Sequence, residues 1–158
     1  MSDEPALLEE TIEVAAPVER VWALVSDLPR LAEWSPQVVR SIKRSSGPIQ
    51  LGTALVNINR RGPLVWPTRS RVVRFEPHRE IAFRITDNQM VWSFTLEPIE
   101  ADGSGGTRIT QRRQAPDGIG AISRRLIAIA FGGQETYGEE LRQGMRATLA
   151  RVKVAAEG

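Results

Sequence analysis

The first third of the chain alternates between apolar and polar residues and then changes to a helical spacing. Residues 7–14 alternate strictly enough to predict a β-strand with one face in water. From Pro17, which fits the first position of a helix, apolar residues recur three and four apart up to Pro29. A second short helical stretch, residues 30–34, ends before Ser35, because a residue that precedes a proline is disfavoured in a helix. The pattern predicts one strand followed by two short helices.

The middle of the chain has a different pattern, with short β-prone segments separated by turn residues at regular intervals. Each connection carries the Gly, Pro, Asn or Asp that a tight reversal needs. Such spacing favours an antiparallel meander over parallel strands joined by helices. The predicted strands are residues 38–44, 53–60, 64–75, 80–86, 90–97 and 107–113.

After residues 116–118 the chain is predicted to be helical to its end, with a bend at Gly132-Gly133. A seven-stranded antiparallel sheet curls, so the sequence predicts an α+β fold in which a curved sheet grips the long C-terminal helix. The inner face of that helix is expected to carry Ile122, Leu126, Ile129, Gly133, Tyr137, Leu141, Met145, Thr148 and Val152.

Composition narrows the possible chemistry. The 158 residues predict a single domain, 1–158, and with no Cys and one His they exclude disulfides, thiol nucleophiles and multi-His metal sites. The 21 basic and 19 acidic residues leave a net charge of +2, too small to indicate a nucleic-acid surface. The longest apolar run, residues 126–133, is far short of the ~20 needed to cross a bilayer. We expect a cytoplasmic protein without cofactor, metal, nucleic acid or integral membrane association, and either a monomer or a homodimer.

Several stretches of the sequence resemble the START-like, or Bet v 1-like (SRPBCC), superfamily, and within it the polyketide cyclase/dehydrase and lipid-transport group. The resemblance lies in residues 12–27, 34–36, 72–83, 92–98 and 106–110, and in the order of the elements. It implies a helix-grip fold with a cavity between the sheet and the C-terminal helix, which usually holds an apolar or aromatic ligand. Members of the superfamily include carriers, cyclases and receptors, so the fold does not decide the function.

Aromatic residues are the first candidates for the lining of such a cavity. Trp22, on the apolar face of the first helix, is expected in the core. Trp34, Trp66 and Trp92 either fill the core or stack on a planar ligand. Tyr137, the only Tyr, is placed to aim its hydroxyl into the cavity, and Gly residues nearby on the same helix leave room for the sheet or for a ligand.

The last strand carries polar residues where the resembled family more often has apolar ones. Alternation places Ile109, Gln111 and Arg113 on the face toward the helix. An inward Arg needs a partner or water, because burial of an unpaired charge is costly. Arg113 is therefore expected either to hold an anionic group of a ligand or to reach solvent at the open end of the sheet.

The fourth strand is rich in Arg. Strict alternation puts Arg69 and Arg71 on one side with Phe75, and Arg74 on the other. Arg69 and Arg71 are then candidates for the mouth of the cavity, and a solvated basic stripe is the alternative. His78 lies in the turn that follows, and we expect it to serve as a turn residue rather than as a general base.

We interpret the chain first as a binding protein for a hydrophobic or aromatic small molecule, lipid or polyketide-like. The alternative is an aromatase/cyclase-type enzyme in which a pocket Arg stabilises an enolate while Tyr137 or His78 moves a proton. A third hypothesis, an interaction protein that uses its outer Arg residues, predicts salt-dependent retention on an acidic matrix. The candidate ligand-binding residues are Trp34, Trp66, Arg69, Arg71, Trp92, Phe94, Gln111, Arg113 and Tyr137.

Overall fold

A computed structural model describes residues 8–99, 105–115 and 134–158, with side chains in the C-terminal helix from residue 138 onward. The elements follow the predicted order, and most boundaries lie within one or two residues of the predicted ones. They are β1 (Leu8–Val14), α1 (Val18–Val25), the 3-10 turn η1 (Leu28–Arg30), α2 (Leu31–Trp34), β2 (Val38–Lys43), β3 (Ala54–Arg61), β4 (Leu64–Glu76), β5 (Glu80–Ile85), β6 (Val91–Ile99), β7 (Gly106–Gln114) and α4 (Gln134–Glu157).

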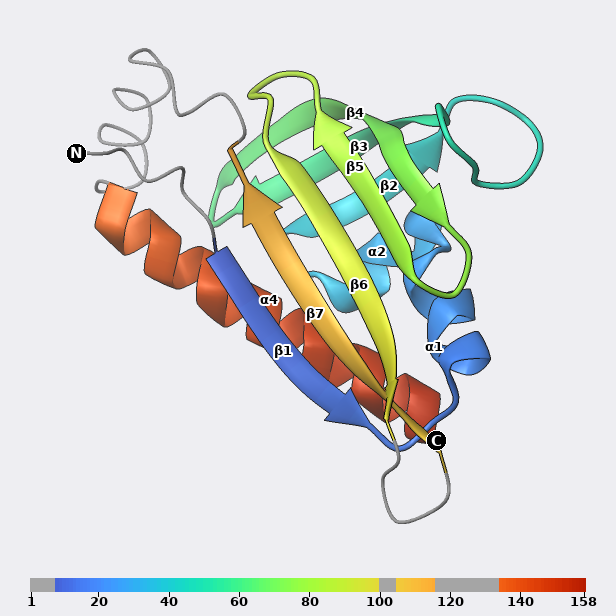
Figure 1. Ribbon diagram of the computed structural model, residues 1–158. Helices are drawn as coiled ribbons and strands as arrows, with labels where there is room; N and C mark the ends of the chain where they lie inside the picture. Colours follow the sequence, from blue (N-terminus) through green and yellow to red (C-terminus); the bar gives the residue numbers. More distant parts are fainter. Residues whose placement is uncertain (1–7, 100–104, 116–133) are drawn as a thin grey trace.

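All seven strands form one antiparallel sheet in the order β1-β7-β6-β5-β4-β3-β2. The sheet curves, α4 runs along β1 and β7 on one of its faces, and α1 and α2 lie at the same side near one end (Figure 1). This arrangement confirms the predicted helix-grip fold. The helical turns expected over residues 119–133, with the bend at Gly132-Gly133, lie outside the described residues.

The start and end of α1 follow from local chemistry. Pro17 adopts an extended conformation (φ −69°, ψ 157°) directly before the helix, one position earlier than predicted. Its fixed φ and missing N–H suit the point where a helix begins. At the other end, the backbone N–H of Ser26 donates to the carbonyl of Trp22 at 2.9 Å, and the Ser26 hydroxyl donates to the same carbonyl at 2.6 Å.

The core lies between the concave face of the sheet and the helices. On α4 the buried residues recur every three or four positions, as the helical period requires. Each buried Leu, Met or Val side chain among them contributes about 1.5–3 kcal/mol by leaving water. None of the described helices has the length and apolar character required to cross a membrane. The α4 face consists of Leu141, Met145, Thr148, Leu149, Val152 and Ala156.

Candidate functional site

The concave face of the sheet is not completely filled. A partly enclosed cavity of about 80 Å³ lies between six strands of the sheet, β2 to β7, and α2. One water needs roughly 10–15 Å³ of such space, so the cavity is larger than a single water site. Its lining is Leu31, Ser35, Gln37, Val38, Asn57, Asn59, Thr68, Phe83, Ile85, Trp92 and Gln111.

A second cavity, of about 30 Å³, lies against α4. It shares Ser35, Gln37, Trp92 and Gln111 with the first cavity, so the two adjoin. Gly144 forms part of its α4 wall, and a Cβ at this position would lie 3.5 Å from Cγ of Pro36. The missing side chain of Gly144 therefore leaves part of this space open. A cavity was expected between the sheet and the C-terminal helix. Only the smaller cavity has described residues of that helix in its lining, whereas the larger one is bordered by α2.

Three buried polar side chains form a hydrogen-bonded row beside the larger cavity. The Ser41 hydroxyl donates to Oδ1 of Asn57 at 2.7 Å, and Nδ2 of Asn57 donates to Oγ of Ser70 at 3.2 Å. The three residues come from β2, β3 and β4 and are 4–7% exposed. Buried polar groups are tolerated where they are paired. The row fixes the Asn57 side chain in the cavity wall.

Two of the sequence candidates, Trp92 and Gln111, line both cavities. Arg113 points to the concave face, as alternation predicts, and is only 6% exposed, so it does not end in solvent. Its guanidinium lies over the Trp92 ring, 5.8 Å from the ring centroid, at a distance where a cation–π contact is favourable. Arg113 does not belong to the lining of either cavity. It supports the indole of Trp92 from beside the site.

Three further candidates lie outside the cavity linings, and a fourth has no described side chain. Trp34 belongs to the core, with the guanidinium of Arg30 5.0 Å from its ring centroid, and Phe94 is a core residue only 1% exposed. Trp66 pairs with Asn59 in the register of β3 and β4 and is partly buried, but it lies outside both cavity linings. Tyr137 lies on α4, and its side chain is outside the described residues.

Arg69 and Arg71 differ from the expectation that they lie at a cavity mouth. Both are exposed on the outer face of β4: Arg69 contacts Asp87 at 3.8 Å, and Arg71 donates to the carbonyl of Gly52. A β-bulge between Val72 and Arg74 is the physical reason. One extra residue reverses the alternation.

The bulge also explains where the inner face of β4 continues. Before it, Thr68, Ser70 and Val72 point to the concave face, and after it Phe75 does, with its ring 5.6 Å from that of Trp22. The inward orientation of Phe75, after the bulge, therefore does not imply an inward orientation of Arg71, before it. The prediction assumed strict alternation over the whole strand, although the bulge divides β4 into two segments whose side chains alternate independently.

His78 occupies the turn between β4 and β5. It has a positive φ of 70°, is exposed, and its ring lies 6.2 Å from that of Trp22. A positive φ is uncommon for a residue other than Gly and is typical of tight turns. His78 is a turn residue and is not part of the cavity wall.

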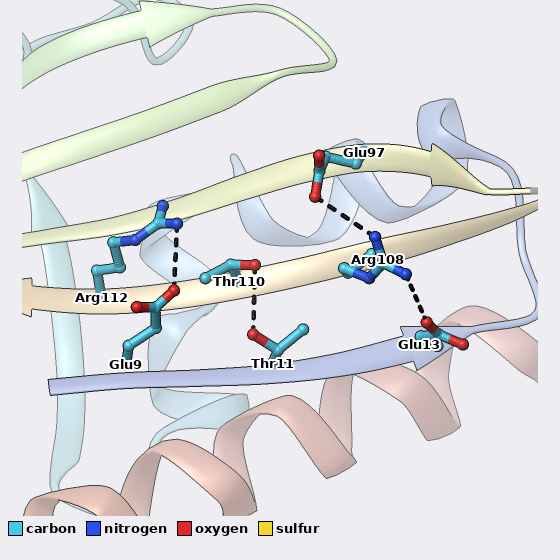
Figure 2. A network of polar contacts seen from close by, with 7 residues as sticks. All are labelled: Glu9, Thr11, Glu13, Glu97, Arg108, Thr110 and Arg112. Carbon is cyan, nitrogen blue, oxygen red and sulfur yellow. Dashed lines mark hydrogen bonds and ion pairs between the residues drawn. The ribbon is translucent and has the colours of Figure 1, made fainter.

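The outer face of β1, β7 and β6 carries paired charges (Figure 2). Arg112 contacts Glu9 at 3.2 Å, while Arg108 contacts Glu13 at 2.9 Å and Glu97 at 3.8 Å. Cross-strand neighbours of opposite charge stabilise a sheet modestly. Because these Arg residues have carboxylate partners, their positive charge is largely compensated on this face.

Sequence reasoning missed the polar wall of the cavity. Asn57 and Asn59 alternate in β3 with the apolar Val56 and Ile58, so the apolar pair resembles the buried face. The structure instead turns Asn57 inward to 4% exposure. The available signal was Leu55, which shares a face with Asn57 and is 2% exposed. Leu55 alone is a weak signal beside the two β-branched residues Val56 and Ile58 on the other face.

One ion pair joins β3 to α4 near the cavity. Nε of Arg61 donates to Oε2 of Glu140 at 2.6 Å, and a second guanidinium nitrogen reaches Oε1 at 2.8 Å. This bidentate geometry is a strong form of the contact. The hydrogen bonds and the charge of Arg61 hold the pKa of the Glu140 carboxyl below its ordinary value.

The lowered pKa gives a pH-dependent contribution to stability. A carboxyl whose pKa is lowered in the folded state stabilises the fold fully at pH values above its ordinary pKa of about 4.3. This stabilisation is lost as the pH falls through the pKa of the folded state. Comparison of the wild type with Glu140→Gln by urea unfolding is expected to give a difference near 1 kcal/mol at pH 7, since the pair is partly exposed. The difference is expected to shrink below about pH 4. The Glu139→Gln control, whose carboxylate lies 3.7 Å from Arg146, should change little, and a pH-independent Glu140→Gln difference would contradict this account.

The curved sheet, the C-terminal helix and the internal cavities define a helix-grip protein with space for a small ligand. The chain belongs to the family described as polyketide cyclase/dehydrase and lipid transport, whose sequence profile matches residues 5–157. No curated protein matches the chain.

Solved structures share the fold. The di-domain ARO/CYC StfQ from the steffimycin biosynthetic pathway is 17% identical with a TM-score of 0.73, and the match covers 98% of this chain and 51% of that one. The chain thus spans about half the length of StfQ. The Zhui aromatase/cyclase from Streptomyces sp. R1128 is 19% identical (TM-score 0.72; 96% and 93% covered). The Polyketide_cyc-like protein Cgl2372 from Corynebacterium glutamicum is 27% identical (TM-score 0.60; 98% and 90% covered).

Proposed function

We propose that this protein binds a hydrophobic or aromatic small molecule in the larger cavity, which is lined by Trp92, Gln111 and side chains of β3 and β4. The observation that carries the proposal is a space larger than one water, whose lining combines apolar and aromatic side chains with hydroxyl and amide groups. Membership of the polyketide cyclase/dehydrase and lipid transport family supports the same conclusion. An engineered cavity of roughly 150 Å³ binds benzene. The two adjoining cavities here hold about 80 and 30 Å³, so a ring-bearing ligand fills the enclosed space and extends through the opening.

The cavity near α2 is preferred over a wider hollow at the opposite end of β6 and β7. That hollow has about 480 Å³, is more open, and is lined by Pro17, Val18, Glu19, Pro98, Ile99, Gly105 and Gly106. An open hollow leaves much of a ligand in water, whereas binding sites bury most of the ligand surface. The hollow serves as the competing site in the tests below.

The catalytic alternative requires an acid–base group at the cavity. Among the described residues that line the two cavities there is no carboxylate, His, Tyr, Lys or Arg. His78 is on a turn against Trp22, and Arg113 lies behind the Trp92 ring. Binding needs only the cavity and is the function that the described residues support best.

Titration with toluene and phenol, followed by two-dimensional ¹H–¹⁵N NMR, tests the proposal. We expect saturable shifts of the Trp92 indole N–H and of the side-chain amides of Asn59 and Gln111, because these groups line the cavity. Shifts confined to Val18, Ile99 and Gly106 would place the ligand in the open hollow and overturn the proposal. The absence of any saturable shift with both compounds would also overturn it.

A further inference from the structure

The described lining of both cavities is free of charge. The larger cavity offers hydroxyl and amide groups from Ser35, Gln37, Asn57, Asn59, Thr68 and Gln111, and the smaller one adds Thr148. A carboxylate transferred from water to such a site would lose hydration without gaining an opposite charge, which is costly. The polar side of the cavity thus suits uncharged groups.

The hydrogen bonds already made in the wall decide which polar atoms remain for a ligand. Nδ2 of Asn59 donates to the carbonyl of Trp66 at 3.2 Å and to Oγ1 of Thr68 at 3.0 Å. An amide nitrogen has two hydrogens, so both donors are used. Within the described residues no hydrogen bond reaches Oδ1 of Asn59, which remains as an acceptor in the lining.

Gln111 supplies a second acceptor. Its side chain comes from β7, on the opposite side of the cavity from Asn59, and is 5% exposed. Its Oε1 is buried without a hydrogen-bond partner in the described part of the chain. A buried acceptor without a partner costs about 1–3 kcal/mol, and a ligand hydroxyl that donates to it removes that cost.

The planar group beside Gln111 is the Trp92 indole. Arg113 lies over the Trp92 ring, and the same indole forms part of both cavity linings. Phe83 and Ile85 add apolar surface to the same wall. A flat ring placed against Trp92 therefore brings a substituent within the region of the Gln111 amide.

We propose that Gln111 determines specificity by selecting an uncharged, hydroxylated ring, whose O–H donates to the Gln111 amide oxygen while the ring lies against Trp92. This inference rests on the proposed function and names its ligand class. Asn59 offers a second acceptor for a further hydroxyl. Carboxylate-bearing ligands, fatty acids among them, are disfavoured because the described residues of the lining offer no cation.

The experiment measures by NMR titration the dissociation constants of three single-ring probes: phenol, toluene and benzoate. Toluene has the size of phenol without the donor, and benzoate carries the charge. The variants are Gln111→Met, which keeps the length of the side chain and removes the acceptor, and Gln114→Met as the matched control. Gln114 lies on the same strand and, by alternation, on the opposite face.

We expect the wild type to bind phenol more tightly than toluene and benzoate at least tenfold more weakly than phenol. In Gln111→Met the preference for phenol over toluene should fall about three- to tenfold, the value of one neutral hydrogen bond. Gln114→Met should keep the wild-type preference. Since Gln111→Met removes a buried acceptor without a partner, its unfolding midpoint should be no lower than that of the wild type.

The outcomes separate the two proposals. If all three proteins bind at the cavity with the same ratio of phenol to toluene affinity, the role of Gln111 is wrong and the binding function stands. If benzoate binds as tightly as phenol, the selection for uncharged ligands is wrong. If no probe shifts the cavity signals, the binding function fails as well.

Discussion

Replacement of Asn57 with Leu is expected to lower the free energy of unfolding by about 2 to 5 kcal/mol, because it leaves two buried hydroxyls without partners. Ser41 donates to the Asn57 amide and Ser70 accepts from it, and all three residues are buried. Leu has the same number of side-chain heavy atoms as Asn and the same branch at Cγ, so the loss reports mainly on the hydrogen bonds. Urea unfolding followed by circular dichroism measures the change.

A triple variant is the control for this prediction. Asn57→Leu combined with Ser41→Ala and Ser70→Ala removes every member of the row, so no polar group is left unpaired. Replacement of a whole network by apolar groups is often close to neutral, whereas removal of one member is not. The triple variant should therefore be more stable than Asn57→Leu alone. An Asn57→Leu protein within about 0.5 kcal/mol of the wild type would show that the row contributes little.

The largest expected effect on binding comes from Ser35→Phe. Ser35 follows α2 and lines both cavities, so a Phe side chain at this position occupies the space that a ring would take. We expect phenol binding to weaken at least tenfold, since ligand and side chain compete for one volume. Overpacking costs typically about 1–3 kcal/mol, so an unfolding curve accompanies each titration.

Ser46→Phe is the matched control for the cavity-filling variant. Ser46 lies in the exposed connection between β2 and β3, away from both cavity linings. It adds the same aromatic side chain without entering the cavity, and phenol binding should equal that of the wild type. Phenol affinity within twofold of the wild type in a folded Ser35→Phe protein would mean that the ligand binds elsewhere.

The fold was predictable because its elements are set by local patterns. Alternation in β1, helical spacing before Pro29 and turn residues between the strands are short-range signals, and the structure follows them closely. The inward positions of Gln111 and Arg113 were predictable for the same reason, since β7 is regular from end to end. Each of these inferences needed only one element at a time.

The site was less predictable because it depends on pairings between elements. The bulge that turns Arg69 and Arg71 outward is visible only in the register of β4 against β5. Asn57 faces inward because Ser41 and Ser70 meet it from neighbouring strands, and these residues are far apart in the sequence. Trp34 ends a predicted helix and Trp92 lies in a predicted strand, and only packing places the first in the core and the second at the cavity.

The central claim is that a planar ligand lies in the cavity beside Trp92. Intermolecular nuclear Overhauser effects between bound phenol and the isotope-labelled protein test it most directly, because they arise only between protons that are in close contact. The account predicts contacts from the phenol ring protons to the side chains of Trp92, Phe83 and Ile85. Contacts instead to Val18 and Ile99, in the open hollow at the other end of the sheet, would contradict it.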